Sequence, residues 1–125
     1  MRAINPSTVA KPASNYAQAV EVNSGRRLVI SGQVGVSPDG TVFEGYEAQA
    51  EQVWVNILAL LEAADMGVGN LVAIRVYDVA PGNVAIYRAI RDRVLKGHLV
   101  AATYVIVAGL ASLQFLTEIE AEAVG

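Results

Sequence analysis

Two segments of the chain repeat apolar residues at the period of an α-helix. Residues 46–64 place an apolar side chain at nearly every third or fourth position, which is typical of a helix with one buried face. Gly67 follows as a natural helix stop. Residues 84–96 are preceded by Asn83, which can cap a helix, and are followed by Gly97. The pattern therefore predicts two helices.

The remaining apolar residues alternate with polar ones or gather in short β-branched runs, which indicate strands. Turn signals separate these runs, as at residues 37–40, where a proline and a glycine suit a tight turn. The pattern predicts strands at residues 17–22, 27–31, 41–43, 71–79, 102–107 and 116–124. The order β-β-β-α-β-α-β-β predicts an α+β fold, with one mixed sheet and both helices packed on one face.

The hydrophobic composition of the chain indicates how the second face of that sheet is covered. The 125 residues make a single domain, residues 1–125, of which 54% are hydrophobic, with a mean hydropathy of +0.40. The longest apolar run, residues 53–61, is interrupted by Asn56 and falls short of the ~20 residues of a membrane span. We therefore expect no membrane partner, and we expect another subunit to cover the second sheet face.

Charge and rare residues exclude several function classes. A formal net charge of -3 argues against a nucleic-acid partner. Cysteine is absent, and His98 is the single histidine, so we expect no thiolate chemistry, no metal site and no cofactor. The first residues lack the apolar stretch of a signal peptide, and we expect a cytoplasmic protein. Arg88 and Arg91 lie one helical turn apart, and we interpret them as a solvated face.

Three carboxylates alternate along the last predicted strand. Glu118, Glu120 and Glu122 point to one side because residues i and i+2 share a face, roughly 7 Å apart. If this face is buried at an interface, at least one glutamate pKa should rise, which suits general acid-base work. The alternative interpretation is a solvated strand face.

Arg75 lies within an apolar predicted strand. Alternation places it with Ala73 and Tyr77, on the face away from the helices, where we also expect the glutamates. We interpret it as the partner of a structural ion pair with one of the glutamates. The alternative is that Arg75 binds the substrate.

Four short motifs occur in an order that resembles the RidA/YjgF family, small trimeric proteins that include imine deaminases and L-PSP endoribonucleases. They are Asn-Tyr-Ala-Gln-Ala-Val at 15–20, Leu-Val-Ile-Ser-Gly-Gln-Val at 28–34, Ala-Gln-Ala-Glu-Gln at 48–52 and Thr-Glu-Ile-Glu-Ala at 117–121. The resemblance implies a chorismate-mutase-like fold, a homotrimer, and small-molecule clefts between subunits.

The resemblance also implies roles for individual residues. Tyr16 would line the cleft, and Ser31 and Gly32 would bring backbone close to the ligand. Glu120 would be catalytic, orienting or activating a water molecule. Gly32 has an alternative interpretation as a bulge or sheet-packing glycine.

One departure from the family pattern concerns substrate binding. Family deaminases carry a Pro-Ala-Arg run whose arginine clamps a substrate carboxylate, whereas this chain has Ala102 at that position. Losing such a charge-assisted pair costs on the order of 2–5 kcal/mol of binding. Tyr104 shares a strand face with Ala102, and Tyr87 replaces a family asparagine. Either tyrosine lines the cleft or packs in an interface.

These features leave three functions open. The first is a divergent enzyme that hydrolyses an imine or enamine other than the 2-iminobutyrate type. The second is a non-catalytic trimer that binds a metabolite or a protein, and the third, less favoured, is an endoribonuclease. A cleft lined by Tyr16, Ser31, Gly32 and Glu120 would favour the enzyme. A cleft filled by Tyr87 and Tyr104 would favour the non-catalytic trimer.

Overall fold

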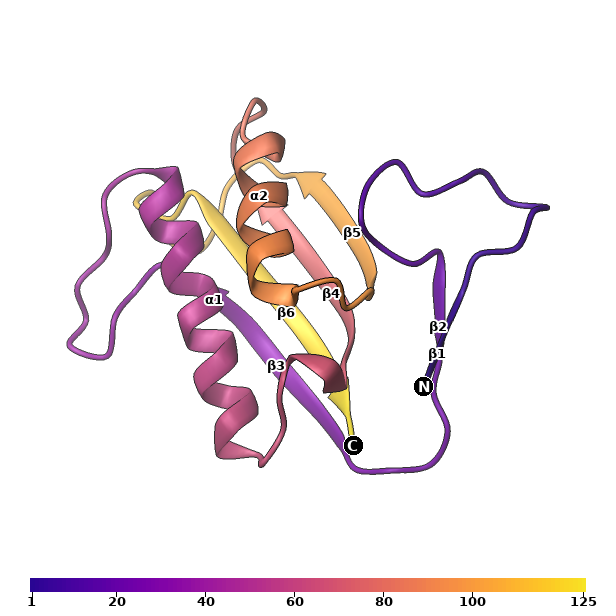
Figure 1. Ribbon diagram of the computed structural model, residues 1–125. Helices are drawn as coiled ribbons and strands as arrows, with labels where there is room; N and C mark the ends of the chain where they lie inside the picture. The colour runs from indigo at the N-terminus through magenta and orange to yellow at the C-terminus, as the bar shows by residue number, and fades with distance from the viewer.

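The centre of the molecule is a four-stranded mixed sheet with two helices on one face (Figure 1). The computed structural model describes residues 1–125. The strands of this sheet are β3 (Arg27–Val34), β4 (Leu71–Asp78), β5 (Ala101–Ile106) and β6 (Thr117–Val124), and the helices are α1 (Tyr46–Ala63) and α2 (Val84–Leu95). The spatial order is β3-β6-β4-β5, with β4 and β5 parallel and the other neighbours antiparallel. A 3-10 turn, η1 (Val68–Asn70), precedes β4.

The start of the chain forms an arm beside β5 (Figure 1). Its strands β1 (Arg2–Ile4) and β2 (Ala19–Glu21) pair antiparallel in a sheet of their own. The arm reaches the main body at two points. The backbone N–H of Ala17 donates to the carbonyl of Val100 at 2.8 Å, and Asn15 Nδ2 donates to Asp92 Oδ2 at 3.0 Å.

The α+β class, both helices and the four strands of the main sheet confirm the sequence prediction within a few residues. The first part of the chain differs from it. Residues 41–43 make only an isolated bridge, between Val42 and Val36, because the turn closed by the Ser37 N–H and the Thr41 carbonyl at 3.0 Å leaves too few residues to pair. The predicted strand at 17–22 is shorter and pairs with β1, which the pattern did not predict. Of its residues only Ala17 meets the mixed sheet, in a single bridge to Ala101.

The core lies between the helices and the sheet, as helical period and strand alternation require. Each fully buried aliphatic or aromatic side chain there stabilises the fold by about 1.5–3 kcal/mol. The main contributors are Val53, Trp54, Ile57 and Leu61 from α1, Ile90 and Leu95 from α2, and Ile74, Val76, Ile119 and Ala121 from the sheet. Neither helix combines the length and the apolarity that crossing a membrane requires.

Gly35 lets α1 approach the end of β3 closely. A Cβ at this position would lie 2.5 Å from Gln49 Cβ and 2.6 Å from Gln49 Cα. The buried Gln49 amide donates to the carbonyls of Phe43 and Gln114, each at 2.9 Å, and accepts from the Leu116 N–H at 2.9 Å. This side chain ties two loops to α1, and the contact requires glycine at position 35.

We call the sheet face opposite the helices the outer face. It carries the side chains of Val29, Arg75, Tyr77, Thr103, Val105, Glu118, Glu120 and Glu122. The face is mostly polar, although Val29 is 62% exposed. Other exposed aliphatic side chains lie on α1, at Val55, Leu58 and Leu60. The apolar excess of the composition is therefore not concentrated on the outer face.

Candidate functional site

A hollow of about 270 Å³ lies where the arm, α2 and β5 meet. We call it the α2–β5 pocket. It is lined by Ala13, Ser14 and Tyr16 of the arm, Val84, Tyr87, Arg88 and Arg91 of α2 and its first turn, and Ala102 and Tyr104 of β5. The register of β5 against β4 turns Ala102 and Tyr104 towards the helices, beside Ile74 and Val76. The pocket thus unites Tyr16, Tyr87, Ala102 and Tyr104, four of the residues that the sequence singled out.

Two tyrosine rings form one wall of this pocket. The ring centroids of Tyr87 and Tyr104 are 5.3 Å apart, and the ring planes are tilted by 38°, an arrangement that aromatic pairs favour. Burial raises the pKa of Tyr87 to about 12. Burial, followed by the hydrogen bond to Asp78, raises the pKa of Tyr104 as well. Both hydroxyls therefore remain protonated donors at neutral pH.

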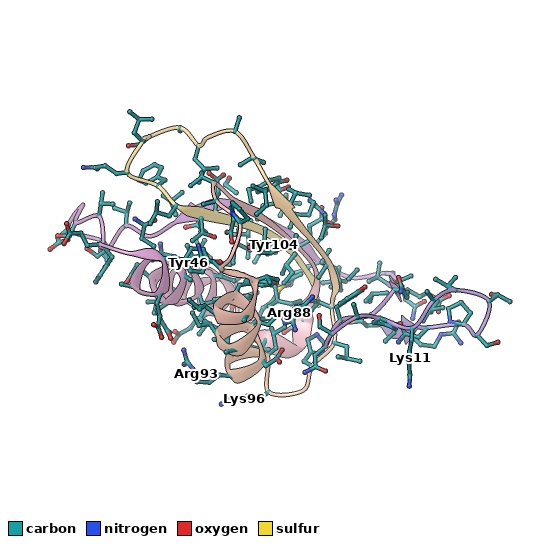
Figure 2. The ribbon with its side chains drawn as sticks, turned by 90° about the horizontal axis from the view of Figure 1, so that it is seen from above. Lys11, Tyr46, Arg88, Arg93, Lys96 and Tyr104 are labelled. Atoms are coloured by element: carbon teal, nitrogen blue, oxygen red, sulfur yellow. The ribbon has the colours of Figure 1, made fainter.

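The hydroxyl of Tyr104 points into the protein rather than into the pocket. It donates to Oδ2 of Asp78, which is fully buried at the end of β4. Thr117 Oγ1 donates to the other oxygen, Oδ1, at 2.6 Å. Tyr46 reaches the same region from the start of α1 (Figure 2), and its pKa is raised by burial and then by Asp78. The ring of Tyr104 therefore faces the pocket and can contact a ligand, while its hydroxyl is bonded to the buried Asp78.

The two arginines of the pocket differ from the solvated pair that the sequence predicted. Arg91 is only 2% exposed, and its guanidinium carbon lies 5.5 Å from the centre of the Tyr87 ring. Its Nε donates to Asp92 Oδ1 at 3.0 Å. Its Nη2 lies 2.9 Å from the same oxygen, but in a direction that makes no hydrogen bond. Arg88 is half-buried in the pocket wall.

A pattern in the sequence points to the burial of Arg91. Residues 87, 91 and 95 are spaced by four, so they form one stripe along α2. Tyr87 and Leu95 are both buried, and Arg91 lies between them. Reading the stripe rather than the charge would have placed Arg91 on the inner side of α2.

On the outer face, the glutamates are paired with cations. Glu120 Oε1 accepts from Arg75 Nε at 2.7 Å and from the Tyr77 hydroxyl at 2.5 Å. Glu122 Oε1 accepts from Arg75 Nη2 at 3.3 Å and from Arg27 Nη2 at 3.1 Å. The ion pair expected between Arg75 and a glutamate is therefore present.

The pairing determines the protonation of Glu120. The hydrogen bond from Tyr77, followed by that from Arg75, holds the pKa of Glu120 below its ordinary value. This direction is opposite to the rise expected for a carboxylate buried at an interface. Hydrogen bonds to the charged form and a neighbouring cation outweigh desolvation in the single chain.

Gly32 lies at an irregularity of β3, where the pairing with β6 shifts between Ile30 and Gln33. A Cβ on Gly32 would lie 1.8 Å from Glu118 Oε2, so the glutamate carboxyl group occupies the space above the glycine. Ser31 is exposed beside it. A second hollow, of about 320 Å³, is lined by Tyr77, Val107, Gly109, Leu110, Glu118 and Glu120.

The predicted site residues therefore form two groups on opposite faces of the sheet. Tyr16, Tyr87, Ala102 and Tyr104 belong to the α2–β5 pocket, and Ser31, Gly32, Arg75 and Glu120 belong to the outer face. The first group offers aromatic rings and lies beside the cations Arg88 and Arg91. The second group offers the carboxylate of Glu120 and the backbone of Gly32, which has no side chain. Within one chain these two groups do not contact the same ligand. Nowhere do three His, Cys, Asp or Glu side chains gather in a metal-binding arrangement.

Comparison with known proteins gives consistent matches. The model of the family described as Endoribonuclease L-PSP matches residues 7–125. A RutC family protein of Aquifex aeolicus is 40% identical over 78 residues, which are 62% of this chain and 61% of that protein. The chain thus matches less than two thirds of the length of this curated relative.

Two further relatives bear on structure and chemistry. A protein of unknown function from Yersinia pestis, YyfB of the conserved Rid protein family, has a TM-score of 0.90 at 35% identity, covering 99% of this chain and 98% of that chain. The 2-iminobutanoate/2-iminopropanoate deaminase of Salmonella typhimurium is 40% identical over 63 residues, 50% of this chain and 48% of the enzyme.

Proposed function

The chain belongs to the endoribonuclease L-PSP family, also called RidA/YjgF, and on that premise we propose that it binds a small molecule in a cleft completed by a second copy of the chain. One observation carries the proposal: the residues of the two groups lie on opposite faces of the sheet. A ligand contacts Ala102 and Glu120 together only if one copy supplies the pocket and its neighbour supplies the outer face. A closed ring of such head-to-tail contacts is a homotrimer if the rotation between copies is 120°.

We propose that the assembled cleft hydrolyses an imine or enamine. Water adds to the carbon of the protonated C=N bond, and the resulting carbinolamine expels ammonia to leave a carbonyl group. Glu120 is ionised at neutral pH, and its pKa lies below the ordinary value. It acts best as an acceptor that orients the water, since a low pKa makes it a weak base. The name of the Salmonella typhimurium relative supports this reaction class.

Ala102 restricts the substrate. The methyl group of Ala102 offers neither a hydrogen-bond donor nor a charge to a substrate carboxylate at this point of β5. We therefore propose that 2-iminobutyrate-type compounds, which the family arginine would clamp here, are poor substrates.

A non-catalytic binding trimer is the second candidate. Tyr87 and Tyr104 already occupy part of the α2–β5 pocket, and Arg75 and Tyr77 already occupy one oxygen of Glu120. Both observations favour binding without turnover. The endoribonuclease function is less favoured because the chain has a formal net charge of -3, which opposes the binding of RNA.

An assay with 2-iminobutyrate, generated in situ from threonine, tests the proposal. The wild-type protein should accelerate hydrolysis little, and Ala102→Arg should increase the rate because it restores a cation at this position of β5. Glu120→Gln should remove that gained activity. Rapid turnover by the wild-type protein would contradict the role given to Ala102. If Ala102→Arg binds the product 2-oxobutyrate but hydrolyses nothing, the binding trimer is correct.

A further inference from the structure

We propose that Arg88 and Arg91 of α2 form a carboxylate-binding subsite in the α2–β5 pocket. The inference rests on the proposed function in one respect, that this pocket holds a small molecule. It adds a ligand class, a small carboxylate with an unsaturated or apolar body. It also locates the recognition of the carboxylate on α2, across the pocket from Ala102, so the carboxylate is held away from the position at which an arginine on β5 would clamp it for hydrolysis.

Arg88 differs from every other arginine of the chain. Arg2, Arg27, Arg75 and Arg93 form ion pairs with glutamates, Arg91 contacts Asp92, and Arg26 donates to the carbonyl of Ala64. Arg88 makes neither an ion pair nor a side-chain hydrogen bond, although it is half-buried in the pocket wall. A partly desolvated guanidinium without an acceptor is unfavourable, and an anion in the pocket would relieve that cost.

Arg91 supplies the second, independent observation. Its guanidinium is almost fully buried in the wall of the same pocket, and Nη2 has no hydrogen bond. The one acidic side chain bonded to Arg91 is Asp92, through Nε. Asp92 is shared, because its other oxygen accepts from Asn15 of the arm at 3.0 Å. Nη2 is therefore a buried donor that makes no hydrogen bond, although it lies 2.9 Å from Asp92 Oδ1 in the ion pair between Arg91 and Asp92.

The helix brings the two arginines together. Residues 88 and 91 are three apart, so their side chains lie on one face of α2. In Figure 2 Arg88 lies on the side of α2 that faces β5, towards Tyr104, whereas Arg93 points to the opposite side. Two cations on one pocket wall repel each other, and a bound anion removes that repulsion. The unpaired Arg88 and the Nη2 atom of Arg91 therefore both favour a negatively charged ligand.

The shape and the other walls of the pocket select among anions. Planar guanidinium groups match the planar carboxylate, which accepts two hydrogen bonds side by side. The rings of Tyr87 and Tyr104 and the methyl group of Ala102 form an apolar surface for the rest of the ligand. A volume of about 270 Å³ suits a small molecule. These properties favour a small carboxylate over inorganic phosphate, which has no apolar part.

Calorimetric titration with three probes tests the subsite without depending on turnover. The probes are 2-oxobutyrate, its neutral amide 2-oxobutanamide, and inorganic phosphate. We expect the wild-type protein to bind 2-oxobutyrate more tightly than the other two. Arg88→Met should weaken the binding of 2-oxobutyrate by about tenfold, equivalent to about 1.4 kcal/mol. It should leave the affinity for the amide unchanged.

Arg93→Met is the matched control. It removes the same charge from the same helix, but Arg93 pairs with Glu51 away from the pocket. It should leave 2-oxobutyrate binding unchanged. Arg91→Lys, which keeps the charge but loses the fork of donors, should weaken 2-oxobutyrate binding while the protein remains folded by circular dichroism.

Several results would overturn the subsite. They are absence of 2-oxobutyrate binding to the wild-type protein, equal affinity in Arg88→Met and Arg93→Met, an amide that binds as tightly as the acid, and tighter binding of phosphate. The failure of the proposed function has a different signature. A monomeric protein that still binds 2-oxobutyrate through Arg88 would refute the shared cleft and leave the subsite intact.

Discussion

The outer face and the α2–β5 pocket differ in how fully their arginines are paired. On the outer face Arg75 and Arg27 neutralise Glu120 and Glu122 within the chain. In the pocket Arg91 pairs with Asp92, whereas Arg88 makes neither an ion pair nor a side-chain hydrogen bond. A charge satisfied by its own fold contributes to structure, whereas a charge left without an acceptor at a hollow is available to a ligand. The contrast assigns anion recognition to the pocket and water orientation to the outer face.

Substitutions at two glycines should differ most in their effect on the free energy of unfolding, because Gly35 packs against α1 whereas Gly32 lies on the outer face. Gly35→Ala forces a Cβ against the backbone of α1 at Gln49. It should lower the free energy of unfolding by about 3 kcal/mol. Gly32→Ala meets only side-chain atoms of Glu118, which can rotate away, so it should cost less than about 1 kcal/mol while reducing the affinity for 2-oxobutyrate. Urea unfolding of both variants measures the two costs.

The order of these two costs is the critical outcome. If Gly32→Ala destabilises the protein as much as Gly35→Ala, then Gly32 is a scaffold residue. Its alternative interpretation as a sheet-packing glycine would then hold, and the outer face would lose its place in the cleft.

Asp78 tests whether Tyr104 belongs to the core or to the ligand site. Asp78→Ala leaves the buried hydroxyls of Thr117 and Tyr104 without an acceptor, so it should lower the free energy of unfolding by about 3 kcal/mol. Tyr104→Phe removes one hydrogen bond and keeps the ring, so it should cost about 1 kcal/mol. Its affinity for 2-oxobutyrate should remain unchanged. A large loss of affinity would instead mean that the hydroxyl contacts the ligand.

The smallest expected effect is the loss of the contribution of Glu120 to stability at low pH. The folded pKa of Glu120 lies below its ordinary value of 4.5. Its contribution to stability is therefore complete above about pH 4.5 and is lost as the pH falls through the lower, folded pKa. Because Glu120 and Arg75 are 33% and 40% exposed, the contribution should be below about 1 kcal/mol.

Glu120→Gln isolates this contribution. The variant cannot lose a charge at position 120, so its stability should fall less steeply than that of the wild-type protein below pH 4.5. Urea unfolding at a series of pH values measures both slopes. Parallel slopes would show that the contacts from Tyr77 and Arg75 do not persist in solution.

Patterns along single elements predicted most of the fold. Helical period located α1 and α2, and alternation along β4 and β6 placed Arg75 and Glu120 on one face, where they pair. The short strand β1 has three residues and no pattern of its own, so only its pairing with β2 reveals it.

The site was harder to predict because it depends on contacts between elements. The division of its residues between two faces follows from the register of β5 against β4, which no single strand encodes. The charge of Arg91 predicts exposure, whereas its place in the stripe of residues 87, 91 and 95 predicts burial, and its contacts with Tyr87 and Asp92 show which of the two holds.

Mixed oligomers test the shared cleft most directly. Arg88→Met damages the pocket group and Glu120→Gln damages the outer-face group, so homogeneous oligomers of either variant have only defective sites. Co-expression with two affinity tags yields mixed oligomers, whose binding of 2-oxobutyrate and hydrolysis of candidate imines are compared with those of each variant alone. If each cleft takes one group from each of two copies, about a quarter of the sites in random mixtures regain both intact groups, and wild-type function returns at those sites. If mixing restores nothing although mixed oligomers form, the two groups do not share a cleft and the account is wrong.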